Sequence, residues 1–344
     1  MNSSFVLDIE NVPALVTYLR GRGAIAATDT PAVRKLEGGV SNRVMLVKAE
    51  SAPAFVMKQA LEKLRVEVNW FCTPTRINKE ALALEYLSEL TPPGAIPRVL
   101  FKDSGQHLLA MQAVPEPHEI WKQILLAGCI ERDHVEQFAR LLGSIHSKSS
   151  QRKTELELPF EDRSIFEALR VEPYYRYTAA SVAESARFLD ELIADTLSLR
   201  LALVHGDFSP KNILVHNGRL VLLDCEVVHF GDPAFDIGFS MAHLFGKANH
   251  LETHRNSFAE AAVVYWQTYS ACVCNTPWAA TLEPRAVRHS LACSLARVAG
   301  RSPLEYLTPP ERAAHKAAVL KLMANPPSAM PDLVKQFIRE LSCR

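Results

Sequence analysis

The chain has 344 residues, of which 48% are hydrophobic and 22% charged, so we expect a folded globular protein with room for two lobes of ordinary size. Its 38 basic and 38 acidic residues cancel, and this balance gives no sign of a nucleic acid or an anionic membrane surface as a partner. The seven cysteines include no C-x-x-C pair, and no apolar run approaches the ~20 residues that span a bilayer, so we expect a cytoplasmic protein without structural disulfides, zinc or membrane spans.

The first segments predict a short helix and then a strand pair. Apolar residues recur at helical spacing over residues 8–20, and two glycines then end the pattern. Residues 35–47, KLEGGVSNRVMLV, predict strand segments that Gly38-Gly39 and Ser41-Asn42 interrupt. A plain turn explains the Gly-Gly pair as well as a phosphate-binding loop does, because the full G-x-G-x-x-G pattern is absent.

A lysine and a glutamate on the next two elements predict a buried ion pair. Residues 54–60, AFVMKQA, predict a strand whose Lys58 either extends to solvent or has an acidic partner. In the predicted helix of residues 77–90, Glu80 lies on the apolar stripe, where a buried carboxylate needs a cation. We therefore expect Lys58 and Glu80 to pair.

Two further strands and a break end the first part of the chain. Residues 96–114 predict two strands joined by a short turn, and the Pro-Glu-Pro of residues 115–117 then interrupts the pattern. We place the hinge between two lobes here. Residues 1–114 are expected to form the N-terminal lobe and residues 115–344 the C-terminal lobe.

The second part begins with helical spacing. Residues 135–146 and 182–199 predict helices, and the polar residues 149–157 between them predict a loop. We expect a structural role for His146, at the end of the first of these helices.

The stretch from Leu203 to Phe239, LVHGDFSPKNILVHNGRLVLLDCEVVHFGDPAFDIGF, carries the most specific pattern in the chain. Asn217-Gly218 lies between two short apolar runs, which is the strongest local signal for a two-residue hairpin. Pairing across that turn sets Asn212 opposite the residue before Asp224. The hairpin thus brings Asn212 and Asp224 together at its open end, beside the loop that carries Asp207.

This group of oxygen donors suits phosphoryl transfer. An amide and a carboxylate bind a hard divalent ion such as Mg²⁺, and the second carboxylate is free to accept a proton from an incoming hydroxyl. For each residue taken singly, the alternative is a purely structural role as a polar cap of the hairpin. A metal-dependent phosphohydrolase built on His205, Asp207 and Asp224 is another alternative, and it would require histidine as a metal ligand.

The spacing Asp207-x4-Asn212, with His-Gly-Asp in place of His-Arg-Asp, resembles that of the aminoglycoside phosphotransferase and choline kinase-like family of small-molecule kinases. The resemblance implies a protein-kinase-like bilobal α+β fold, with an N-terminal antiparallel sheet and a larger, mainly helical C-terminal lobe. It implies ATP and Mg²⁺ as cofactors, Asp207 as the catalytic residue, and Asn212 and Asp224 as metal ligands. Asp236, in the later Gly-Asp-Pro segment, would support the catalytic loop.

The same resemblance assigns the N-terminal lobe to the nucleotide. Small residues let backbone N–H groups approach the phosphates, a lysine paired with a glutamate holds the α and β phosphates, and the hinge backbone binds the adenine edge. The residues implied to bind the nucleotide are Gly39, Ser41, Asn42, Lys58, Glu80, Gln112 and Val114.

Two runs resemble the 5-methylthioribose kinase branch of the family. One is KQALEKLRVEVNWF, which leads into an insertion at residues 63–76 whose aromatic side chains are otherwise explained as cover for the lobe. The other is ARVAGRSPLEYL, residues 296–307, which makes Arg297 and Arg301 candidate substrate contacts, although arginines at a helix end are commonly plain surface residues. Glu226, in the D-x-E that replaces D-F-G, is a candidate for the metal shell or a substrate contact.

The charge of the C-terminal helices bears on the acceptor. From Phe245 onward there are twelve basic and seven acidic residues, which does not suit a polycationic aminoglycoside. We therefore predict ATP-dependent phosphorylation of a hydroxyl on a sugar-like or other non-polycationic metabolite, with an aminoglycoside or amino-alcohol (choline-type) kinase as the alternative. A non-catalytic nucleotide-binding module is the alternative from another class, and the sequence leaves open whether the protein forms a homodimer.

Overall fold

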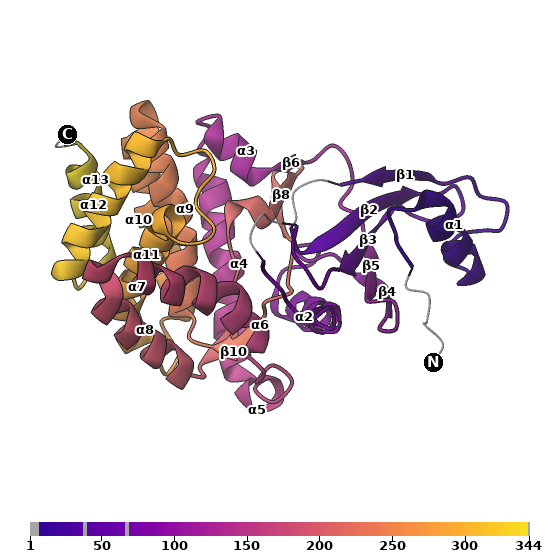
Figure 1. Cartoon of the computed structure of the whole chain (residues 1–344), viewed down its shortest axis with the longest axis horizontal. Coiled ribbons are helices and arrows are strands. Elements are labelled where there is room, and N and C mark those ends of the chain that lie inside the picture. The colour runs from indigo at the N-terminus through magenta and orange to yellow at the C-terminus, as the bar shows by residue number, and fades with distance from the viewer. Residues whose placement is uncertain (1–6, 37–39, 66–68, 343–344) are drawn as a thin grey trace.

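The computed structural model describes residues 7–36, 40–65 and 69–342. A smaller lobe built on a five-stranded antiparallel sheet lies beside a larger, mainly helical lobe (Figure 1). This arrangement confirms the predicted α+β fold with an N-terminal sheet. The division after residue 114 stays a prediction; β5 (Leu108–Gln112) ends just before it and β6 (Glu119–Ile120) begins just after it.

The sheet of the smaller lobe has the strand order β1-β2-β3-β5-β4. Successive side chains of β3 (Phe55–Ala60) alternate between its faces, so Met57 joins a core beneath helix α1 (Val12–Gly21) whereas Lys58 lies on the opposite face. Helix α2 (Arg76–Leu90) packs on that opposite face, where its Glu80 meets Lys58. The remaining strands are β1 (Ala32–Lys35), β2 (Asn42–Lys48) and β4 (Val99–Asp103).

Polar side chains fix the start of two helices. At α1, the Asn11 side chain accepts a hydrogen bond from the Ala14 backbone N–H at 3.2 Å. At α12 (Pro309–Ala324), Thr308 and Glu311 form a reciprocal capping box. Both helices therefore begin where local side chains satisfy backbone donors that the helix leaves free.

The larger lobe is built around helix α9 (Ala234–His250), which is buried along nearly its whole length. It packs against α10 (Arg255–Val273) and α11 (Ala279–Ala299). A Cβ at Gly238 of α9 would lie 2.4 Å from the carbonyl carbon of His289 on α11. Helices α9 and α11 therefore approach this closely only because residue 238 is glycine. In the described ranges, no helix is both long and apolar enough to cross a bilayer.

Further helices and strands complete this lobe (Figure 1). They are α3 (Trp121–Leu126), α4 (Arg132–Gln151), α5 (Lys153–Leu156), α6 (Ser164–Phe166), the π-helix η1 (Glu167–Arg176), α7 (Tyr177–Ser181), η2 (Ala183–Ser185), α8 (Ala186–Ser198), β7 (Ala202–Val204), η3 (Pro210–Asn212), β10 (His229–Gly231), η4 (Glu252–His254) and α13 (Met330–Ser342).

The loop predicted at residues 149–157 is wrong, because α4 continues to Gln151 and α5 follows it. Ser149 and Leu156 are fully buried within this polar segment. A helix needs only one buried face, and its other face accommodates polar residues, so a run of polar letters does not exclude it.

The predicted hairpin is confirmed with its register. Strand β8 (Ile213–His216) pairs with β9 (Arg219–Leu222), with His216 opposite Arg219. Asn217 and Gly218 have φ angles of 50° and 71°, as a type I′ turn requires. The backbone N–H of Leu223 donates to the Asn212 carbonyl at 2.8 Å, which extends the pairing up to Asp224.

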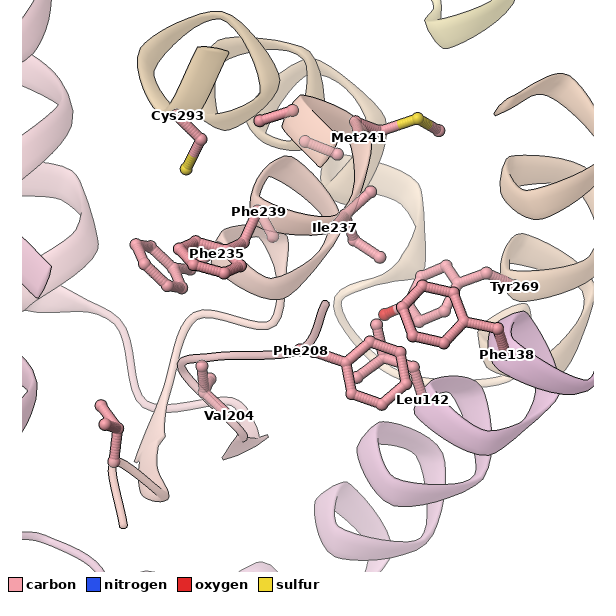
Figure 2. Packing of buried hydrophobic residues seen from close by; sticks show 14 of the residues in the cluster. Phe138, Leu142, Val204, Phe208, Phe235, Ile237, Phe239, Met241, Tyr269 and Cys293 are labelled. Atoms are coloured by element: carbon pink, nitrogen blue, oxygen red, sulfur yellow. The ribbon is translucent and has the colours of Figure 1, made fainter. Parts of the chain in front are cut away.

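Aromatic packing anchors the loop that follows β7. The ring of Phe208 is fully buried and stacks on Phe138 of α4, with the centroids 4.3 Å apart (Figure 2). In the same cluster, Phe235 and Phe239 of α9 stack with centroids 5.8 Å apart. The Ser240 hydroxyl of α9 donates to the Phe208 carbonyl at 2.9 Å, so the loop between β7 and η3 is held against both α4 and α9.

Candidate active site

The loop that carries Asp207 takes its shape from a glycine and a buried carboxylate. Gly206 has a φ of 76°, and a Cβ there would lie 2.6 Å from Cγ1 of Val227. Asp236 accepts hydrogen bonds from the backbone N–H groups of His205, at 2.6 Å, and of Gly206, at 2.8 Å. The structure thus confirms that Asp236 supports the loop, and it gives a steric reason for Gly in place of the Arg of His-Arg-Asp.

Buried histidines extend this support. His146 lies 3.1 Å through Nε2 from Asp236 and 2.8 Å through Nδ1 from the hydroxyl of Tyr269, so its role is structural as expected. The Nδ1 of His205 accepts from the Asp207 backbone N–H at 3.2 Å. Burial lowers the pKa of His205, against the pull of Asp236. Nδ1 of His205 is engaged with the Asp207 backbone and the ring is fully buried, so this histidine is poorly placed as a metal ligand, which argues against the phosphohydrolase alternative.

Asp207 is almost fully buried and lies between two cations. Its Oδ2 lies 2.8 Å from Nζ of Lys211 and accepts a hydrogen bond from Nδ2 of Asn212, also at 2.8 Å. Its Oδ1 lies 3.1 Å from the Arg170 guanidinium but accepts no well-aligned hydrogen bond within the described residues. Burial raises the pKa of Asp207, but Arg170 and Lys211 outweigh it and hold that pKa below the ordinary value.

The sequence analysis missed both of these cations. Arg170 comes from the π-helix η1, and its Nε also donates to the carbonyl of Gly206 at 2.5 Å. Nothing in its neighbourhood along the chain marks it, because it precedes the loop by more than thirty residues. Lys211 had a usable signal, since it stands beside Asn212 inside the motif.

Lys58 joins the two lobes. Its Nζ lies 2.6 Å from Oε1 of Glu80 and 2.7 Å from Oδ1 of Asp224. Burial lowers the pKa of Lys58, but Asp224 and Glu80 outweigh it and hold the pKa above the ordinary value. Burial raises the pKa of Glu80 against the pull of Lys58. Asp224 has a φ of 63°, a left-handed conformation that costs a non-glycine residue energy and is common at functional sites.

Glu226 lies on the side of the site that faces the smaller lobe. Its Oε2 accepts hydrogen bonds from Nε of Arg76 at 3.0 Å and from Nδ2 of Asn42 at 3.1 Å. Arg76 is 1% exposed and also donates to the carbonyls of Leu61 and Ser41. This ion pair, which the sequence analysis did not predict, ties α2 and the start of β2 to the segment after Asp224.

The donor set fits a hard divalent cation. Single carboxylate oxygens of Glu80, Asp224 and Glu226 lie within 4.8 Å of one another. Asn212 uses its Nδ2 to bond Asp207, and no donor within the described residues bonds its Oδ1. A carboxylate cluster with a free amide oxygen beside it is the oxygen-only environment that Mg²⁺ takes in proteins.

Of the other predicted nucleotide residues, two adjoin this site and two line a separate hollow. Ser41 and Asn42 are buried at the start of β2, and Gly39 lies outside the described residues. Gln112 and Val114 line a hollow of about 670 Å³ together with residues 92–97, the β8–β9 turn and α4. Because neither Lys58 nor Asp207 lines it, this hollow is separate from the cluster of charged groups.

Arg297 and Arg301, the predicted substrate contacts, lie in different environments. Arg297 is only 7% exposed, so it is not the plain surface residue of the alternative, and it donates to the hydroxyl of Tyr174 at 2.9 Å. Arg301 is exposed and lies over the ring of Tyr177 at 5.0 Å. Neither arginine touches Glu226 or Asp207 directly.

A model of the phosphotransferase enzyme family matches residues 32–272, well over half of the chain. The chain belongs to this family. Membership confirms the resemblance to this family, and the groups of the candidate site from Ser41 to Asp236 fall within the matched range, whereas Arg297 and Arg301 lie beyond it.

Curated relatives of the phosphotransferase are methylthioribose kinases. Methylthioribose kinase 2 of Oryza sativa subsp. japonica is 27% identical over 269 residues, which make up 70% of this chain and 61% of the rice protein. The methylthioribose kinase of Pectobacterium carotovorum subsp. carotovorum (strain PC1) is 24% identical over 301 residues, with 74% of this chain and 72% of that one covered. The match to the rice protein therefore spans less than two thirds of its length.

Solved structures of low identity share the fold of the phosphotransferase. An amicoumacin kinase in complex with AMP-PNP and Ca²⁺ has a TM-score of 0.58 at 15% identity, over 93% of this chain and 96% of its own. A choline/ethanolamine kinase family protein from Mesorhizobium loti has a TM-score of 0.56 at 16% identity, over 96% and 100%. These likenesses confirm the predicted protein-kinase-like fold.

Proposed function

We propose that this phosphotransferase transfers the γ-phosphate of ATP to a hydroxyl group of a sugar-like, non-polycationic small molecule, with Mg²⁺ at the phosphates. One observation carries the proposal. A lysine from the sheet lobe reaches Asp224 at 2.7 Å at the open end of the hairpin whose Asn212 bonds Asp207 at 2.8 Å. A cation suited to phosphates, oxygen atoms suited to a metal, and a carboxylate whose Oδ1 accepts no aligned hydrogen bond within the described residues thus converge between the two lobes, which is the set of groups that phosphoryl transfer uses.

Lys58 is the group expected to hold the α and β phosphates. An ammonium has three donors, and Glu80 and Asp224 take two of them here. Glu80 is fully buried and has no contact with solvent, so its carboxylate holds the Lys58 ammonium in a fixed position. In a site from which water is excluded, a pre-positioned charge acts on phosphate oxygens more strongly than it would in water.

Asn212 and Asp224 are the residues expected to hold the metal. Mg²⁺, when bound, neutralises charge on the phosphate oxygens. The hairpin keeps the two side chains at one end of a paired turn, so both are pre-positioned by local structure. Glu226 stays paired with Arg76 and Asn42, which leaves it in reach of the same carboxylate cluster.

Asp207 is expected to orient the acceptor hydroxyl. Because Arg170 and Lys211 hold its pKa below the ordinary value, Asp207 is ionised at neutral pH and accepts a hydrogen bond through Oδ1, the oxygen without an aligned donor. A carboxylate of low pKa is a weak base, so its contribution is to position the hydroxyl. Arg170 and Lys211 would also lie close to the negative charge of the group in transfer.

Two features support a sugar-like acceptor. The curated relatives are methylthioribose kinases, and methylthioribose is a sugar derivative. Around Asp207, the groups nearest to an incoming acceptor are the cations Arg170 and Lys211, which would repel the ammonium groups of an aminoglycoside or of choline.

The test is a transfer assay on the purified protein with ATP and Mg²⁺. The acceptor panel contains methylthioribose, ribose, choline, ethanolamine and one aminoglycoside, with product followed by ³¹P NMR. We expect Asp207→Asn to lower kcat by about 10²–10⁴-fold, the usual range for losing a positioned acid–base group, while ATP binding persists. Asp332→Asn, an exposed carboxylate on α13, is the matched control and should leave kcat unchanged.

Three results would contradict the proposal. Retained turnover in Asp207→Asn would remove its catalytic residue. ATP binding without transfer to any acceptor would favour the non-catalytic module. Turnover of choline or the aminoglycoside in preference to the sugars would favour the alternative kinase class.

A further inference from the structure

A group of cations lies around and beyond Asp207, and aromatic side chains connect its members to one another. The ring of Tyr174 has the Arg170 guanidinium at 5.8 Å and the Arg297 guanidinium at 5.7 Å from its centroid. Arg170 also lies 5.5 Å from the ring of Phe239 on α9. The ring of Tyr174 thus connects Arg170, which contacts the loop of Asp207, to Arg297 on α11. The contact with Phe239 connects Arg170 to α9.

Lys247, one turn from the end of α9, is the most unusual member of this group. It is 0% exposed, and its ammonium donates to the carbonyl of His243, one helical turn earlier, at 3.3 Å. Within the described residues, neither Lys247 nor Arg297 has a carboxylate at ion-pair distance. A buried ammonium without a counter-ion is costly, because burial removes its hydration and nothing replaces it.

Tyr306 brings a further cation to Lys247. Its ring has the Lys247 ammonium at 5.6 Å and the Lys122 ammonium of α3 at 6.0 Å from the centroid. A Cβ at Gly246 would lie 2.8 Å from the Tyr306 hydroxyl, so the segment after α11 presses closely on α9. Lys122 pairs with Glu305, which is largely exposed.

Several buried polar atoms here have no partner within the described residues. They are Nε2 of His243, Nε of Arg297 and the hydroxyl of Tyr306. His243 is 2% exposed and its ring packs at a tilt against Phe239, with ring centroids 5.4 Å apart. Unsatisfied buried donors are rare in folded proteins. Three of them lie beside Lys247 and Arg297, which have no carboxylate partner within the described residues, and together these groups indicate a binding site for hydrogen-bond acceptors.

The ion pairs leave an excess of positive charge. Five cationic side chains form the group, and their carboxylate partners are Asp207 and Glu305. The five are Lys122, Arg170, Lys211, Lys247 and Arg297. Asp207 is needed for the acceptor hydroxyl, so the more distant cations, Lys247 and Arg297, are those left for a ligand.

We infer that the phosphate acceptor carries a negatively charged group, a carboxylate or a phosphate ester, which binds at Lys247, Arg297 and Lys122 while its hydroxyl meets Asp207. This inference rests on the proposed function and narrows its substrate class from a sugar-like compound to an anionic one. The unpaired donors of His243 and Tyr306 supply further hydrogen bonds to the same group.

Binding of such an anion has a signature that a structural lysine lacks. Burial, with Lys122 and Arg297 adding to it and Glu305 opposing it, lowers the pKa of Lys247 to about 7. A bound anion favours the charged ammonium, so above pH 7 binding takes up a proton. The other groups that face Lys247, His243 and Tyr306, are neutral at that pH because burial lowers the pKa of His243 and raises that of Tyr306.

The experiment compares acceptors that differ chiefly in charge. Purified protein with ATP and Mg²⁺ is assayed on glycerol against glycerate, glucose against glucuronate, and ribose against ribose 5-phosphate, so carboxylate and phosphate are tested separately. Wild type should prefer one anionic series in kcat/KM by about 10–100-fold, which is what one charged hydrogen bond of about 1.5–3 kcal/mol supplies. In Lys247→Met that preference should fall by a similar factor, through KM.

Matched variants separate binding from stability. Lys335→Met removes the same charge from an exposed position on α13 and should leave the preference unchanged. Lys122→Met should also lower the preference for anionic acceptors. The Lys122 side chain is 25% exposed, so the fold should tolerate this change more readily than Lys247→Met. Thermal unfolding of each variant shows whether it is folded, and calorimetry of glucuronate and ribose 5-phosphate in two buffers of different ionisation heat measures proton uptake.

The outcomes for the inference and for the proposed function differ. Transfer to neutral acceptors alone, or an anion preference that survives Lys247→Met and Lys122→Met, would overturn the inference and leave the function standing. Anion binding with proton uptake that depends on Lys247, but without transfer, would refute the function and support the anion site. Neither transfer nor anion binding would refute both.

Discussion

Gly206→Ala tests whether the backbone of the loop before Asp207 sets the activity. Gly206 has a φ of 76°, and the added Cβ would lie 2.6 Å from Cγ1 and 3.2 Å from the carbonyl oxygen of Val227. The left-handed conformation costs an alanine about 1–2 kcal/mol, and overpacking a filled site adds about 1–3 kcal/mol. The N–H of Gly206 also bonds Asp236 at 2.8 Å, so relief of the clash moves the loop away from that support.

Gly218→Ala is the matched control, because it separates strain from space. Gly218 has nearly the same φ, 71°, but a Cβ there meets nothing within 4 Å. We expect urea unfolding to show a loss of about 1–2 kcal/mol for Gly218→Ala, and about 2–5 kcal/mol for Gly206→Ala. Displacement of the catalytic loop should also lower kcat by about 10²-fold in Gly206→Ala alone.

Equal losses of stability in the two alanine variants would show that Val227 gives way without cost. A normal kcat in a destabilised Gly206→Ala protein would refute the argument that the loop backbone positions Asp207. Both results come from the same two purified variants, with the transfer assay and urea unfolding run side by side.

Two further predictions concern buried charges. Arg76→Met should lower the free energy of unfolding, measured in urea, by about 3–5 kcal/mol, because it leaves the Glu226 charge buried without its partner. The double variant Arg76→Met with Glu226→Leu should recover part of that loss. An unstable double variant and a stable single variant would contradict this reasoning. Asp236→Asn tests pH dependence: burial raises the pKa of Asp236 but His146 and His205 outweigh it, so the pKa in the folded state is below the ordinary 3.8. The stability that the Asp236 charge contributes is therefore fully present above pH 3.8 and is lost as the pH falls through the lower folded-state value. Unfolding measured from pH 6 to pH 3 should show the gap between wild type and Asp236→Asn narrowing at the acid end, and a gap that widens there would refute the assignment.

Much of the site could be predicted because its residues are linked by short-range rules. The type I′ turn at Asn217-Gly218 fixes the register of β8 and β9, and the register then brings Asn212 to Asp224. The pairing of Lys58 with Glu80 was predicted because each is a charged residue within an apolar pattern. The structure places Nζ of Lys58 2.6 Å from Oε1 of Glu80. Strand and helix periodicity act over a few residues, so they can be read from the chain directly.

The residues that were missed depend on contacts between distant parts of the chain. Arg76 and Glu226 are separated by 150 positions in the sequence. An arginine at the start of a helix is usually exposed, so the sequence alone gave no sign that the fold buries it. The loop expected at residues 149–157 failed for the same reason, because burial of one helix face is a property of the neighbours and not of the segment.

The sequence by itself determined the two-lobed fold class, the hairpin that brings Asn212 towards Asp224, and the pairing of Lys58 with Glu80. Only the tertiary structure decided which cations surround Asp207, and that Lys247 and Arg297 are buried with no carboxylate partner among the residues that the structure describes. The physical reason is that hairpin and helix patterns arise from neighbours along the chain. The charge balance of a site arises from side chains that packing brings together from separate elements, and that balance bears on the acceptor.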